Sequence, residues 1–222
     1  YGNLPWAFMS LLYGAGGTLE NDMDDLTKDV WRKPMQKLKD AYDTGVVAPM
    51  DVDGEQAFGS GKAVFAQLGT WAQGNMSDTL GADKIAEANT LQYDADNPVN
   101  FFYQCNWMQL KDPHRSAAKS AAAADFVNYV YEHWMDWSEV GSISPAYRDL
   151  NNPEYQKLIQ ASFTNGKKER DAIKTSNYLY GGYATAGWGT YNDIVYGNVG
   201  LEEGLKTLDL MAQGQIEIQE ES

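Results

Sequence analysis

Apolar residues recur at intervals of three and four positions along much of the chain, a pattern that predicts amphipathic helices. The clearest run covers residues 29–43, with apolar side chains at Trp31, Met35, Leu38 and Tyr42. Gly45 follows where a helix-terminating glycine belongs. Further helices are expected over residues 5–12, 53–60, 70–80, 116–134, 153–163, 184–196 and 201–211. The acidic tail after Gln213 is expected to be frayed.

Two other stretches have the pattern of strands. The residues over 63–68 alternate in character as those of a strand do, and residues 101–110 are rich in aromatic and apolar side chains. Trp71 therefore falls where a predicted strand passes into a predicted helix. Ligands of α/β folds commonly gather at such junctions, because the first backbone N–H groups of a helix have no partner within it.

Composition narrows the classes of partner. The chain has 222 residues, of which 17 are basic and 31 acidic, so its formal net charge is −14. This charge repels phosphate backbones and anionic lipid headgroups, which argues against binding to nucleic acid or to a membrane surface. No apolar run approaches the roughly 20 residues of a membrane span. The chain lacks an initiator Met and a signal peptide, so we expect a fragment or a trimmed chain.

Motifs for catalysis and metal binding are absent from the sequence. Cys105 is the single cysteine, which excludes an intrachain disulfide and a thiol-based metal cluster. His114 and His133 are the only histidines, and they lack the spacing of a zinc-binding pair. No nucleophile elbow, phosphate-binding loop or dinucleotide fingerprint occurs. We therefore predict no catalytic residue, no metal and no cofactor.

Aromatic residues make up 13% of the chain, including 7 Trp and 14 Tyr. Trp6, Trp71 and Trp188 stand at loop or helix entries, and the last two lie close to glycines, which can leave an indole face open to a ligand. The C–H face of a sugar ring packs on such a surface, while carboxylates and amides accept hydrogen bonds from its hydroxyls. The alternative is ordinary packing, which we favour for Trp31, Trp107, Trp134 and Trp137.

The order of these signals resembles a known family. Residues 57–65, AFGSGKAVF, run into Gly69-Thr70-Trp71, and this stretch is similar to an F-x-x-G-K-A-A-M … G-x-W signature. Gly16-Gly17 upstream and residues 141–145, GSISP, downstream resemble further parts of the same pattern. The family is the sugar-binding group of extracellular solute-binding proteins of ATP-driven importers, typified by the maltodextrin-binding protein. The resemblance implies that this chain corresponds to the carboxy-terminal portion of such a protein, without its amino-terminal half.

This resemblance implies an α/β fold of the periplasmic-binding-protein type (type II), with two lobes and a cleft. Residues 1–96 and 151–222 would form the carboxy-terminal lobe, and residues 97–150 would cross to the amino-terminal lobe. The protein would capture a sugar or oligosaccharide in the inter-lobe cleft and deliver it to the membrane permease subunits of the importer, without catalysis. It would be extracellular, either anchored to the cell surface as a lipoprotein or periplasmic.

The resemblance also implies ligand-contacting positions. Trp71, Trp188 and Trp6 match aromatic contacts of the family, whereas Asp51 and Tyr178 fall at contact positions with a different residue type. Two other functions stay open. A carbohydrate-active hydrolase would need two opposed carboxylates, and the sequence places no such pair. A peptide-binding or purely structural domain would show no response to sugars.

Overall fold

The computed structural model describes residues 4–45, 47–101, 109–139, 149–158, 161, 173–174 and 178–221. The chain groups into two compact units. Unit 1 comprises Tyr1–Leu68, Ala88–Tyr103 and Gly166–Ser222, and unit 2 comprises Gly69–Glu87 and Gln104–Asn165. This grouping does not decide the expected division at residues 97 and 151, which stays a prediction.

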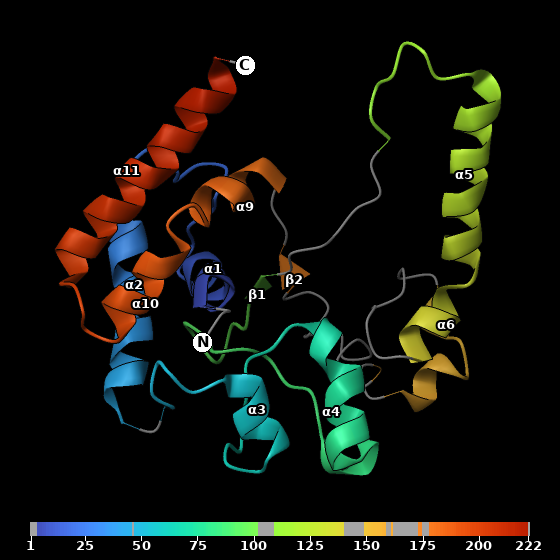
Figure 1. Ribbon diagram of the computed structural model, residues 1–222. Coiled ribbons are helices and arrows are strands. Elements are labelled where there is room, and N and C mark those ends of the chain that lie inside the picture. Colours follow the sequence, from blue (N-terminus) through green and yellow to red (C-terminus); the bar gives the residue numbers. More distant parts are fainter. Residues whose placement is uncertain are drawn as a thin grey trace. The chain divides into compact units, whose positions relative to one another are not determined.

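Unit 1 consists mainly of helices, and α1 packs against two of them (Figure 1). Its helices are α1 (Leu4–Gly14), α2 (Asp29–Asp43), α3 (Gly54–Gly59), α9 (Tyr178–Ala184), α10 (Trp188–Val195) and α11 (Leu201–Glu220). Two short strands, β1 (Asn100–Phe101) and β2 (Ile173–Lys174), pair in parallel. Helix α1 contacts α2, α10 and β1, while α11 lies against α2, α9 and α10.

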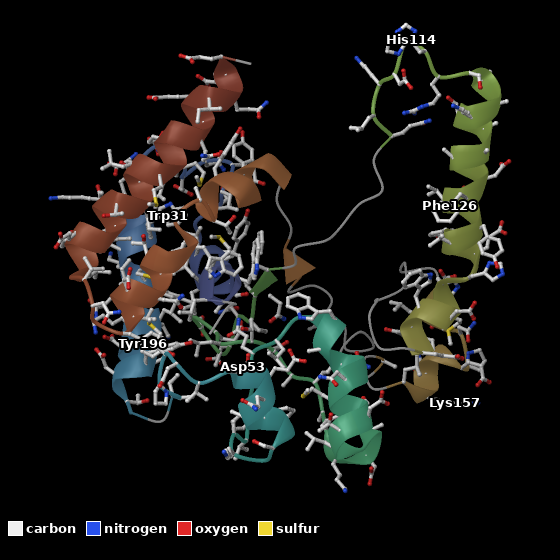
Figure 2. The ribbon with its side chains drawn as sticks, in the orientation of Figure 1. Trp31, Asp53, His114, Phe126, Lys157 and Tyr196 are labelled. Carbon is white, nitrogen blue, oxygen red and sulfur yellow. The ribbon has the colours of Figure 1, made fainter. Side chains whose placement is uncertain are left out.

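The core of unit 1 forms where the apolar sides of these helices meet. Helix α2 buries Trp31, Met35 and Leu38, the positions that its periodicity predicted, and it begins and ends at the expected residues. Trp31 lies among the packed helices (Figure 2), and its side chain is fully enclosed. Helix α11 contributes Leu205 and Leu208 to the same core. The sequence pattern therefore identified both the helix at 29–43 and its buried side.

The acidic loop between α1 and α2 is tied to two helices. The indole N–H of Trp31 donates to the backbone oxygen of Asp22 at 2.6 Å. The backbone N–H of Leu26 donates to the Asp209 carboxylate of α11 at 3.0 Å, and the Gln213 side chain donates to the Met23 oxygen at 2.7 Å. Helix α11 then continues to Glu220, so the expectation of a frayed tail after Gln213 was wrong.

Unit 2 has a smaller core. Its elements are the 3-10 helices η1 (Thr70–Ala72), η2 (Ala82–Lys84) and η4 (Tyr155–Lys157), and the α-helices α4 (Gln73–Leu80), α5 (Ala117–Glu132) and α6 (Trp134–Glu139). Leu150, Tyr155 and Ala161 are buried together, with Trp134 packed against them. Helix α5 buries no residue, and its Phe126 is 54% exposed (Figure 2).

In the stretch expected to be helical over residues 153–163, the chain first forms the 3-10 helix η4, and Ala161 is again helical. Asn152 nevertheless acts as the sequence pattern predicted. Its side-chain oxygen accepts a hydrogen bond from the backbone N–H of Glu154 at 2.9 Å. The capping signal was therefore correct, but it starts a short 3-10 turn rather than an α-helix.

The expected α/β fold of the periplasmic-binding-protein type is wrong, because the described part of the chain is mostly helical and its strands there, β1 and β2, have two residues each. Residues 63–68 form neither a strand nor a helix, and Val64 and Phe65 are 82% and 88% exposed. Most of the strand expected over 101–110 lies outside the described residues. An alternating pattern describes one strand, whereas a sheet also needs a partner strand in register, which the pattern does not specify.

Candidate functional site

Two of the predicted ligand-contacting residues meet in unit 1. Trp6 lies in the first turn of α1, and Trp188 is the first residue of α10. Their ring centroids are 5.8 Å apart at an interplanar angle of 76°, an edge-to-face contact. Phe101 of β1 lies parallel to Trp6, with centroids 6.3 Å apart. All three side chains are half-buried, and we call this cluster the aromatic site.

A second aromatic group lies inside the same unit and supports this cluster. Phe8, two residues after Trp6 on α1, is fully buried. It stacks on Trp31 at 5.1 Å and contacts Tyr191 at 5.5 Å between ring centroids. Helix α1 therefore presents Phe8 to the closed core and Trp6 to a partly open surface.

The position of α10, and hence of Trp188, depends on two neighbouring features. A Cβ atom at Gly187 would lie 2.5 Å from Leu208, so the glycine allows α11 to pack against the start of α10. The buried Tyr191 hydroxyl donates to the Ala184 oxygen of α9 at 2.8 Å. Burial raises the pKa of the Tyr191 hydroxyl, which keeps this donor protonated. These contacts hold Trp188 beside Trp6.

Trp71 lies in unit 2, in the turn η1 that leads into α4. Its side chain is 61% exposed, in agreement with the expectation of an open indole face. A Cβ atom at Gly69 would lie 1.7 Å from the Trp71 ring, so the indole rests against the glycine. The helix after Trp71 was predicted correctly, whereas the strand before it is absent, as described above.

For the other two predicted residues, Asp51 and Tyr178, the structure gives no contact with the aromatic site. Asp51 lies in a turn of unit 1 and is exposed. Tyr178 is the first residue of α9, but its side chain lies outside the described residues. The structure thus brings Trp6 and Trp188 into contact and gives no such contact for Asp51. Sequence analysis missed Phe101, which it treated only as part of a strand.

Acid–base and metal chemistry find limited support in the described part of the chain. Burial raises the pKa of the Glu87 carboxyl, which follows η2 in unit 2. No group of three or more His, Cys, Asp or Glu residues is placed to hold a metal ion among the described residues. In the same residues, no helix combines the length and apolar character needed to cross a membrane. The aromatic site therefore presents mainly apolar ring surface to a ligand.

Comparison with known proteins finds no matching family model, no matching curated protein and no matching solved structure.

Proposed function

We propose that this chain binds a neutral sugar or oligosaccharide at the aromatic site and acts as the substrate-capture protein of an ATP-driven importer. The observation that supports this proposal is the contact between Trp6 and Trp188. Their rings meet at 5.8 Å, yet both stay half-buried, unlike the fully enclosed Trp31 of the core. Aromatic rings that remain partly open, held by neighbouring helices, are a common feature of small-molecule sites.

The ring geometry suits a sugar. The two rings meet at an interplanar angle of 76°, and the part of each ring that stays in solvent is an apolar surface of the kind that packs against the C–H face of a pyranose. The hydroxyl rim of the ligand can then bond to water or to polar side chains. The net charge of −14 favours a neutral ligand over an acidic sugar.

The importer role comes from the sequence resemblance. In this proposal the partners are the membrane permease subunits, no catalysis takes place, and no cofactor takes part. The location is outside the cytoplasmic membrane, either at the cell surface through a lipid anchor or in the periplasm. Trp71 and Asp51 stay proposed ligand contacts because both are exposed, and Tyr178 does so by resemblance alone.

The direct test is calorimetric titration with neutral disaccharides and oligosaccharides. We expect the wild-type chain to bind at least one of them and Trp188→Ala to bind at least about tenfold more weakly, as for central aromatic contacts in other sites. Trp137→Ala is the matched control, because Trp137 is 43% exposed and belongs to α6 of unit 2, whereas the aromatic site belongs to unit 1. Thermal melts of both variants show whether they fold.

Three results would contradict parts of this proposal. Unchanged affinity in Trp188→Ala would remove the aromatic site from the proposal. Cleavage of the oligosaccharides would support a hydrolase instead, and chromatography of the products would detect it. Failure of the wild-type chain to bind any sugar would leave the capture function without support.

A further inference from the structure

Two hydrogen bonds tie the end of α10 to the segment that precedes α3. The Tyr196 hydroxyl donates to the backbone oxygen of Ala48 at 3.0 Å. The side-chain amide nitrogen of Asn198 lies 3.9 Å from the sulfur of Met50, to which it donates. All four residues belong to unit 1, and Met50 is 42% exposed. A thioether sulfur is a weak acceptor, so the second bond is the weaker of the two.

The Asn198 amide is held in place by α10. Its nitrogen also donates to the Asp193 carboxylate at 3.1 Å, and its backbone N–H donates to the Asp193 backbone oxygen at 2.8 Å. Because an ionised carboxylate only accepts hydrogen bonds, the bond to Asp193 fixes which side of the amide carries the N–H groups. Gly197, with a φ of +76°, allows the chain to turn between the helix and Asn198. The donor that faces Met50 is therefore positioned by α10 and does not depend on Met50 itself.

The methionines in the described part of the chain differ in their access to solvent. Four are at most 5% exposed: Met9, Met23, Met35 and Met76. Met50 and Met211 are 42% and 44% exposed, so a small oxidant reaches both to a similar extent. Their surroundings differ, because the Met211 sulfur lies at the contact between α10 and α11. A Cβ atom at Gly187 would lie 3.2 Å from that sulfur and 2.5 Å from Leu208.

We propose that Met50 is an oxidation site, at which a peroxide converts the thioether to a sulfoxide and Asn198 binds the added oxygen. In this reaction the sulfur donates an electron pair to one oxygen of hydrogen peroxide, an S–O bond forms and the O–O bond breaks. The second oxygen takes the proton of the first and leaves as water, so the sulfur is oxidised by two electrons and the peroxide is reduced. Methionine sulfoxide reductases reverse such a change.

Oxidation of Met50 strengthens the link between α10 and the segment before α3. The sulfoxide is polar, and its oxygen accepts hydrogen bonds that a thioether sulfur accepts only weakly. The three rotatable bonds of the Met50 side chain allow this oxygen to turn towards Asn198. It then lies closer to the amide nitrogen than the present 3.9 Å of the sulfur, near the usual N–H···O distance of about 2.9 Å.

Oxidation of Met211 has the opposite effect, because it adds a polar oxygen at the apolar contact with Leu208. The two exposed methionines thus respond to the same oxidant with changes of stability in opposite directions. This inference stands apart from the proposed function, because neither Met50 nor Asn198 belongs to the aromatic site.

The test separates the two methionines with leucine variants. Met211→Leu leaves Met50 to be oxidised, Met50→Leu leaves Met211, and Met50→Leu/Met211→Leu measures the effect of all other methionines. Each chain is treated with hydrogen peroxide, peptide mass spectrometry locates the sulfoxides, and thermal melts compare treated with untreated protein. After subtraction of the shift of the double variant, we expect oxidation to raise the Tm of Met211→Leu by about 2–4 °C, as one additional hydrogen bond does in a chain of this length. The Tm of Met50→Leu should fall.

Asn198→Ala in the Met211→Leu background tests the amide. The readout is the difference between treated and untreated forms of the same variant, so the lost bond to Asp193 cancels, and we expect no rise in Tm. In the wild-type chain, the NMR signals of the Asn198 side-chain amide should shift on oxidation and return after treatment with methionine sulfoxide reductases. The proposal would be overturned if Met50 stays unmodified while Met211 is oxidised, or if its oxidation leaves the Tm unchanged or lowers it. A rise that persists in Asn198→Ala, or unshifted amide signals, would also overturn it.

Discussion

Tryptophans 31 and 71 illustrate how far the surroundings of one residue type can differ. Trp31 is fully buried and donates from its indole to the Asp22 backbone oxygen, whereas Trp71 is 61% exposed. We expect Trp31→Ala to lower the free energy of unfolding by about 3–5 kcal/mol, as other large truncations in cores do. Trp71→Ala should change it by less than about 0.5 kcal/mol. Urea unfolding of both variants measures the difference, and equal losses would contradict the burial described here.

Tyr42 makes the stability of unit 1 sensitive to alkaline pH. Burial, and to a smaller extent the nearby Tyr196, raises the pKa of its hydroxyl from 10.0 to about 12. Above pH 10 the unfolded chain loses this proton while the folded chain keeps it. The contribution of Tyr42 to the free energy of unfolding is therefore complete below about pH 10 and decreases as the pH rises towards about 12.

Urea unfolding at about pH 9 and about pH 11 tests this dependence. The control is Tyr42→Phe, which keeps the ring contact with Tyr196 but cannot titrate. Its free energy of unfolding should fall less between the two pH values than that of wild type. Burial also raises the pKa of Tyr196, so part of the wild-type slope should remain in the variant. A slope identical to wild type would show that Tyr42 does not contribute.

At the scale of elements, the start of α3 depends on one side chain. The Asp53 carboxylate accepts a hydrogen bond from the backbone N–H of Gln56 at 2.8 Å (Figure 2). Asp53→Ala should therefore destabilise unit 1 by about 1 kcal/mol, a typical loss for a helix cap. Asp51→Ala is the matched control, because it removes an exposed acidic side chain from the turn before the helix. Chemical unfolding should show a loss only for the Asp53 variant.

Elements that carry their own determinants could be predicted from the sequence. Helix α2 has its buried positions, its spacing and its terminating Gly45, whose φ is +75°, all within one local stretch. The strand expected over 63–68 failed because a strand is completed by a distant partner, which the local pattern does not contain. Helix α11 extends further than expected, and its Gln213 bonds to the loop around Met23, a contact between residues far apart in sequence that no local pattern contains.

The candidate site shows the same limit. Trp6 and Trp188 could be selected from the sequence because their helix entries resemble those of a known family. Phe101 could not, because its role follows from the hydrogen bond to Ser10, 91 positions away, and from the parallel contact with Trp6. Side chains that one local stretch positions were predictable, whereas those positioned by long-range contacts required the structure.

At the scale of the whole molecule, the described residues of the two units form cores of very different size. Helices α1 and α2 contribute many enclosed side chains, whereas α5 buries none. We expect native-state hydrogen exchange to be slowest in α1 and α2 and fast throughout α5, because exchange follows the free energy of local opening. Intrinsic helix propensity alone would give the opposite order, since the alanine-rich α5 has a higher propensity than α2. Equal protection of α5 and α2 would show that burial does not set the order.

The bonds between α11 and the loop ahead of α2 also affect the order of events during synthesis. Leu26 finds its acceptor in Asp209, 183 positions later, and the core around α1 needs Leu205 and Leu208 of the same late helix. A ribosome completes α1 and α2 long before it makes these partners. Their apolar sides therefore stay uncovered until the residues up to α11 have been made, and unit 1 has to close a very long loop to become native. During that interval the nascent chain exposes the surfaces that chaperones bind and that lead to aggregation.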